Sequence, residues 1–355
     1  MYALVLGGLI LPLVPALREL SLRQDAKPLQ VVRQYDTNIR HFAYSFRNQL
    51  QSLYSKYRID PLRPPQSFEG FWKDKESFQF VGARQQFDPK IDEERLRTVQ
   101  RMIVGGGSLN LPGDFVFEQE LFAAETITVG STSTLRAIFS DKDIVLAKNC
   151  TVARWIHADN KIDAGAGCQL YGRCSANGKI ILNENTQFER LSAPLIRTGN
   201  VSHPIPSLNQ QRHHFELPNS AMELDERTSL VTGAITTPDY AVITRNIVAT
   251  NAIVIGAQNL IDGSVKSHVS IHVGPSTVIR GALVCEHDIH IAEGCVIAGP
   301  VIAEGVIFIG PHCVVGTRAM ETSISAPQVE LAIGSRFSGT IWATQSGRVL
   351  SQVGN

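Results

Sequence analysis

Residues 289–315 read IHIAEGCVIAGPVIAEGVIFIGPHCVV, and this stretch decides the fold. Its opening, IHIAEGCVI, is followed 18 residues later by IFIGPHCVV, with aliphatic and small residues at matching places. A fixed period of this length is typical of repeat proteins whose units stack on one another. The polar and sulfur residues within it, such as His290, Cys295 and Cys313, must therefore be judged by their place in the repeat.

The same unit occurs on both sides of this stretch. One set begins at residues 127, 144, 162 and 180, and a second set begins at residues 253, 271, 289, 307 and 329. Positions 1, 3, 7, 9, 13 and 15 of each unit are usually aliphatic or small, whereas most others are polar, glycine or proline. Alternation with a period of two predicts short strands joined by corners. We expect an all-β, three-sided parallel β-helix with about 18 residues per coil.

The two sets of repeats also match each other. LPGDFVFEQELFAAETITVG from residue 111 and TPDYAVITRNIVATNAIVIG from residue 237 align without a gap. We therefore expect a duplicated β-helix, with a first half at 101–195, a polar insert at 196–236 and a second half at 237–355. The length of the insert allows either one continuous rod or two rods side by side.

The N-terminal segment YALVLGGLILPLVPAL carries no charge and is followed by Arg18. We interpret residues 1–18 as a short membrane anchor, with a signal peptide or a buried terminal helix as alternatives. Basic residues after the apolar run place the body on the cytoplasmic side of the inner membrane. The anchoring side chains are Tyr2, Leu4, Leu6, Leu9, Ile10, Leu13 and Leu17.

Residues 19–100 form the next region, which we expect to hold a helix and a connector. Apolar residues recur at helical spacing in it, at Ile39, Phe42, Phe46, Leu50, Leu53 and Tyr57. This spacing predicts an amphipathic helix, which we expect to pack on the protein body. Binding to an anionic membrane surface is the alternative.

Charge and cysteine usage restrict the possible functions. The chain carries 33 basic and 33 acidic side chains, so nucleic acid is not an expected partner. The six cysteines form no CxxC pair. Four of them occupy the seventh, inward coil position, where other coils have Ser133, Thr186, Thr277 and Ser335: Cys150, Cys168, Cys295 and Cys313. We interpret them as small buried side chains and expect no metal, cofactor or small-molecule substrate.

Histidines gather on the outside of the second half. His272 and His290 both take the second, outward position, and His268, Glu286, His287 and Asp288 lie near the preceding corner. A metal site or acid-base chemistry is one interpretation of this cluster. The interpretation adopted is a solvated surface column, because no Asp-His-nucleophile set recurs. No catalytic residue is predicted.

Two further surfaces are candidates for contacts. At the eighth, outward position the second half is apolar, with Leu260, Val278, Val296 and Val314, and such a column is normally covered by the helix, the insert, the other half or another subunit. The terminal coil of a β-helix exposes unpaired backbone groups unless something caps it. Phe337, Ile341 and Trp342 in the last coil are therefore our candidate end-to-end contact, although Phe337 and Ile341 also fit as plain core.

The coils, especially VELAIGSRFSGTIWA from residue 329, resemble the bactofilins, a family of polymer-forming bacterial cytoskeletal proteins. The resemblance covers roughly residues 105–345. It implies a right-handed β-helix, end-to-end association into non-polar filaments without nucleotide, and a short N-terminal membrane attachment. We therefore expect a non-enzymatic, membrane-tethered, self-associating scaffold that organises envelope-associated partners. The duplication and the region before it depart from the family pattern and put simple filaments in doubt.

An enzyme is the alternative. VGPSTV, IAEGCV and VGTRAM also resemble the hexapeptide repeats of left-handed β-helix acyltransferases, which use a histidine base and an acyl donor bound between subunits. The six-residue spacing alone does not separate the two hands. The chain has neither a distinctive catalytic loop nor the C-terminal helix common in those enzymes, so the scaffold remains the preferred interpretation.

Overall fold

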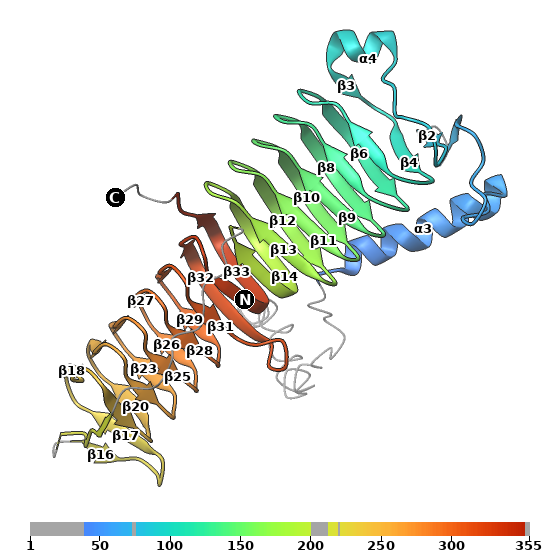
Figure 1. Ribbon diagram of the computed structural model, residues 1–355. Helices are drawn as coiled ribbons and strands as arrows, with labels where there is room; N and C mark the ends of the chain where they lie inside the picture. The colour runs from blue at the N-terminus through green and yellow to red at the C-terminus, as the bar shows by residue number, and fades with distance from the viewer. Residues whose placement is uncertain (1–38, 73–75, 200–211, 219–220, 352–355) are drawn as a thin grey trace, which may run out of the picture. The chain divides into compact units, whose positions relative to one another are not determined.

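The computed structural model describes residues 39–72, 76–199, 212–218 and 221–351. All described residues belong to one compact unit, Ile39–Asn355. The predicted fold is confirmed, because the strands form a parallel β-solenoid of about 13 turns with ~18 residues per turn (Figure 1).

The first solenoid is built from strands on successive turns that pair in parallel. Helix α3 (His41–Tyr57) and strands β1 (Phe68–Phe71) and β2 (Ser77–Val81) precede it, together with the short helix α4 (Ile91–Leu96). Its strands are β3 (Thr98–Val99), β4 (Met102–Gly105), β5 (Leu109–Leu111), β6 (Val116–Ala123), β7 (Ile127–Val129), β8 (Thr134–Ser140), β9 (Asp143–Leu146), β10 (Thr151–Ala158), β11 (Lys161–Ala164), β12 (Gln169–Ala176), β13 (Lys179–Leu182) and β14 (Gln187–Thr198).

The second solenoid follows the same plan. It opens with β15 (His213–His214), β16 (Met222–Glu223), β17 (Thr228–Val231) and β18 (Ile235–Thr236), which lie inside the range assigned to the insert. Its later strands are β19 (Ala241–Ile243), β20 (Asn246–Ala249), β21 (Ile253–Ile255), β22 (Leu260–Ile261), β23 (Val265–Ser267), β24 (Ser270–Val273), β25 (Val278–Ile279), β26 (Leu283–Cys285), β27 (Asp288–Ile291), β28 (Val296–Ile297), β29 (Val301–Ala303), β30 (Val306–Ile309), β31 (Val314–Val315), β32 (Thr322–Leu331) and β33 (Arg336–Val349).

The 18-residue period places like residues on top of one another. Ile271 pairs with Ile289, which pairs with Ile307, so one aliphatic column runs through three turns. In the turn that begins at residue 289, the six predicted inward positions are all buried: Ile289, Ile291, Cys295, Ile297, Val301 and Ala303. The corner after the first strand turns through a left-handed residue at the sixth position, as at Ser276 and Gly294. Alternation and corners together explain the triangular turn.

The beginning of each solenoid is covered. The antiparallel hairpin β1–β2 adds β2 in parallel to β4 and so covers the start of the first solenoid. At the start of the second, β16 pairs antiparallel with β17, and Phe215, Leu217 and Ala221 pack against the core. The described part of the insert therefore contributes a cap and the first turn of the second solenoid.

The two solenoids meet at their C-terminal ends. Strands β14 and β33 pair antiparallel, with Leu191 opposite Ile341 and Ile196 opposite Phe337 (Figure 1). The sequence left open whether the halves form one rod or two rods side by side, and the pairing of β14 with β33 shows that they join at their C-terminal ends. The polypeptide direction reverses at the junction, so each solenoid seals the open end of the other.

Candidate functional site

Helix α3 lies across one outer face of the first solenoid and forms the most developed site among the described residues. Its apolar side recurs at helical spacing, and Ala43, Phe46, Leu50 and Leu53 are buried. They pack on outward side chains of successive strands, among them Phe80, Val104, Phe122, Ala137, Phe139 and Trp155. The expectation that this helix packs on the protein body is therefore confirmed.

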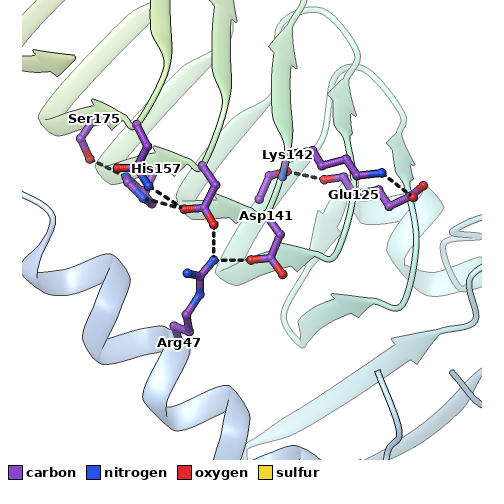
Figure 2. A network of polar contacts seen from close by, with 9 residues as sticks. Arg47, Glu125, Asp141, Lys142, His157 and Ser175 are labelled. Carbon is purple, nitrogen blue, oxygen red and sulfur yellow. Dashed lines mark hydrogen bonds and ion pairs between the residues drawn. The ribbon is translucent and has the colours of Figure 1, made fainter. Parts of the chain in front are cut away.

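Arg47 fixes the helix to a column of aspartates beside this face (Figure 2). Its Nη2 donates to Asp159 Oδ2 at 2.6 Å and also to Asp141. Burial acts to lower the pKa of the Arg47 guanidinium, but the hydrogen bonds to both aspartates outweigh it and raise the pKa. Burial has the opposite effect on an acid: it raises the pKa of the Asp141 carboxyl, and Arg47 opposes that shift. The arginine is thus a charged bridge between helix α3 and two turns of the solenoid.

A buried histidine lies next to this bridge. His157 Nδ1 is 2.8 Å from Ser175 Oγ, and its Nε2 is 3.4 Å from Asp159 Oδ1. The ring is 1 % exposed and contacts the rings of Tyr44 and Phe139. Burial lowers the pKa of His157 to about 4, although the nearby Asp159 opposes this shift. The imidazole is therefore neutral near pH 7.

Ser175, His157 and Asp159 together resemble the residue types of a hydrolytic triad, but their position does not suit catalysis. Ser175 is 2 % exposed and His157 is 1 % exposed beneath helix α3, so a substrate has no access to the hydroxyl. The group instead contributes to the seat of the helix: His157 and Ser175 join two turns through their hydrogen bond beside the Arg47 bridge. We call Arg47, Asp141, His157, Asp159 and Ser175 the α3 latch.

The sequence contained part of the signal for this latch. Asp141 and Asp159 lie one turn apart, as do His157 and Ser175, so each pair shares a column of the repeat. An arginine flanking the apolar stripe of the predicted helix was the complementary signal. The docking of the helix onto this face is a long-range contact, which the repeat pattern does not encode.

The surface histidines stack without forming a site. The rings of His272 and His290 are 5.9 Å apart, and His290 stacks on Phe308 at 4.5 Å. Burial and the neighbouring His272 lower the pKa of His290. His268 Nδ1 is 2.5 Å from Glu286 Oε1. Among the described residues, no group of three metal-ligating side chains comes together.

The seventh-position cysteines have a second role besides filling space. Each of their thiols points at a backbone carbonyl of the preceding turn, as Cys313 Sγ does toward Ala292 O at 3.0 Å and Cys168 Sγ toward Ala147 O at 3.1 Å. Thr277 and Ser335 make the same contact through their hydroxyls. The position therefore favours a hydrogen-bond donor, on a small side chain in most turns and on Asn259 in one, where Nδ2 donates to Thr237 Oγ1 at 2.7 Å. All six cysteines are buried free thiols.

The predicted end contact is made inside the chain. Phe337 and Ile341 are buried opposite Ile196 and Leu191 of the first solenoid, and Trp342 lies opposite Arg190. The backbone closes the junction at both margins of β14: Val349 N donates to Thr186 O at 2.8 Å, and Gly334 N donates to Thr198 O at 2.7 Å. Phe337 and Ile341 are thus contact and core at once, Trp342 is an exposed part of the contact, and the partner of all three is the other half of the same chain.

The predicted apolar column on the second solenoid is regular. Leu260, Val278, Val296 and Val314 pair in turn along β22, β25, β28 and β31, and all four are half-buried. Helix α3, one of the expected covers, packs instead on the first solenoid. Neither helix in the described part of the chain lies over this column (Figure 1).

The predicted anchor residues Tyr2 to Leu17 lie outside the described residues. Within the described ranges, no helix has the length and apolar character needed to cross a membrane. In comparisons with known proteins, no family model, no curated protein and no solved structure matches the chain.

Proposed function

We propose that the chain is a non-enzymatic, membrane-tethered scaffold of the bactofilin-like kind, in which the end-to-end contact of two β-solenoids is made within one polypeptide. The observation that carries this proposal is the antiparallel pairing of β14 with β33. Bactofilin-like filaments are non-polar because their subunits meet through like ends, and here two like ends already meet in one chain.

The closed ends direct further association to the sides. At the starts, one strand of the first turn already has an added partner, β4 with β2 and β17 with β16, and the C-terminal ends of the solenoids cover each other. A capped solenoid end no longer offers free backbone groups to a second copy. Self-association would then use a lateral surface, for which the apolar Leu260–Val314 column is the candidate because a second copy can bury it.

Membrane attachment is the second part of the proposal. The uncharged segment from Tyr2 to Leu17 and the basic residues after it support an anchor at the cytoplasmic side of the inner membrane. The solenoid body would then offer its outer faces to envelope-associated proteins.

Sedimentation and vesicle flotation of the full chain test this function. We expect the chain to float with vesicles, a Leu9→Asp/Leu13→Asp variant to stay behind, and assemblies in detergent to dissociate when Val296 is changed to Asp. Gln169→Asp, in the corresponding polar column of the first solenoid, is the matched control. A non-floating monomer that hydrolyses acyl thioesters, and loses that activity in His290→Ala, would establish the acyltransferase instead.

A further inference from the structure

The face that carries helix α3 has a counterpart in the second solenoid. Ala123 and Ala249 are equivalent in the duplication, and each pairs with a serine in the next turn, Ser140 and Ser267. The outward column next to Ala123 is Phe122, Phe139 and His157, which lies beneath helix α3. The equivalent column next to Ala249 consists of Val248, Lys266, Val284 and Ile302. We call it the second helix face.

No helix in the described part of the chain covers the second helix face (Figure 1). Ile302 is 40 % exposed, and Val248 and Val284 are half-buried. Val248 and Val284 take the places of Phe122 and His157 beneath α3, and Ile302 takes that of Ser175. Lys266, which is exposed, takes the place of Phe139, so the apolar side chains of this face flank the stem of one lysine.

The neighbouring outward column has short side chains, and its polar groups already make hydrogen bonds within the solenoid. It contains Asn246, Ser264, Ala282 and Pro300, so small side chains stand where the first solenoid has Trp155 and Arg173. Asn246 Oδ1 accepts from Ser264 N at 2.8 Å, and Ser264 Oγ accepts from Ala282 N at 3.1 Å. Its polar groups therefore need no partner, and the shallow surface can receive an apolar helix side.

Charged residues also border the second helix face, at the positions that follow its inward column. Asp141 and Asp159, which hold Arg47, correspond to His268 and Glu286, and the next turn has Glu304. Glu286 and Glu304 are exposed, and Glu304 makes no ion pair with the described residues. Glu286 and Glu304 thus offer two carboxylates to a basic side chain, one turn further along than the aspartates that hold Arg47, and Glu286 already pairs with His268, which stands in the place of Asp141.

We propose that the second helix face binds an amphipathic helix of a partner protein, whose apolar side packs on Val248, Val284 and Ile302 and whose Lys or Arg pairs with Glu286 and Glu304. The first solenoid supplies the template, because the same face of the same repeat already seats such a helix. The Leu260 column has no such template, since its counterpart Thr134, Thr151 and Gln169 is polar and carries no helix. The inference names the partner class of the proposed scaffold and rests on that proposal.

A peptide selection tests this inference. The probe is a library of 17-residue peptides, matching the length of α3, in which the apolar positions of α3 are fixed and the others are randomised. Peptides selected on the full chain should carry Lys or Arg at the position of Arg47. Their affinity should fall at least about tenfold in Ile302→Asp. It should fall by about threefold in Glu286→Gln/Glu304→Gln.

Val254→Asp is the matched control, because Val254 is an exposed outward residue on a different strand column, that of β21. Its affinity for the peptides should equal that of the unaltered chain, and circular dichroism should show all variants folded. Ile302→Ser repeats the test in case Ile302→Asp fails to fold.

Selected peptides that bind both Ile302 variants normally, or no enrichment at all, would refute the inference. Dimers of the chain that Ile302→Asp dissociates would assign the face to a second copy. Normal flotation and sedimentation in either case leave the scaffold proposal standing.

Discussion

Arg190, in the last strand of the first solenoid, lies over the indole ring of Trp342 in the last strand of the second, 4.8 Å from its centroid. The two residues are direct partners in the antiparallel register of the junction. The contact marks the outer margin of an interface whose centre is formed by buried residues such as Leu191 and Ile341. A solenoid end that is usually exposed has thus become an internal surface of this protein.

The junction should depend on its buried centre more than on this margin. Trp342→Ala removes a half-exposed cation–π contact, and we expect the free energy of unfolding to fall by about 1 kcal/mol. Ile341→Asp places a carboxylate in the buried centre, and the expected loss is about 3–5 kcal/mol. Urea denaturation measures both, with the exposed Thr344→Ala as control. Equal losses for the two variants would mean that the junction has no packed centre.

The α3 latch predicts that Arg47 holds the helix to the solenoid. Arg47→Met keeps much of the apolar stem but leaves Asp141 and Asp159 without their cation, so we expect a loss of about 1–2 kcal/mol, reduced by the partial exposure of the group. Limited proteolysis should then cleave within His41–Tyr57 faster than in the unaltered chain. Ser52→Ala, on the exposed side of α3, should not change the cleavage rate. Unchanged proteolysis in Arg47→Met would show that apolar packing alone holds the helix.

His157 predicts a specific dependence of stability on pH. The unfolded chain binds a proton on this histidine below about pH 6.5, its ordinary value. The folded protein resists that proton until the pKa of His157, about 4. Stability is therefore fully present above pH 6.5 and is lost as the pH falls toward 4, by about 2–3 kcal/mol from this group. Unfolding curves of His157→Gln should lack this part of the decline. An identical decline in the variant would contradict the buried, neutral imidazole.

The donor role of the seventh coil position predicts different outcomes for two substitutions of one cysteine. Cys313→Ser keeps a donor toward Ala292 O, and we expect its unfolding free energy to stay within about 1 kcal/mol of the original. Cys313→Ala removes the donor without adding bulk, which costs about 1–3 kcal/mol for a buried carbonyl. Thermal unfolding distinguishes the two variants. If alanine is tolerated as well as serine, the donor contributes nothing at this position.

The sequence predicted the parts of the fold that depend on a short period. The turn length, the inward positions and the stacking of His272 on His290 all follow from the 18-residue spacing, and the structure confirms them. The structure places the first turn of the second solenoid at Thr228–Val231, inside the range expected for the insert, and this strand keeps the 18-residue register with Asn246–Ala249.

The repeat period did not predict the contacts between segments that are far apart in the sequence. Arg47 meets Asp141 and Asp159 across roughly a hundred residues. The only sequence signal for this contact was that the two aspartates lie one turn of the repeat apart. The pairing of β14 with β33 reverses direction, so no periodicity relates its strands. The physics of an uncapped coil predicts Phe337 and Ile341 as an end contact or as plain core, but it does not identify the opposing surface as part of the same chain.

A disulfide between Ser192→Cys and Thr340→Cys tests the junction most directly. These residues lie opposite each other, with their hydroxyl oxygens 3.4 Å apart, so the two thiols have the geometry to join. Mild oxidation of the full chain should give a monomer that migrates faster on a denaturing gel, and Ser192→Cys/Ser346→Cys, which is out of register, should give none. Crosslinked dimers in place of the fast monomer, or no crosslink at all, would contradict the internal end-to-end contact.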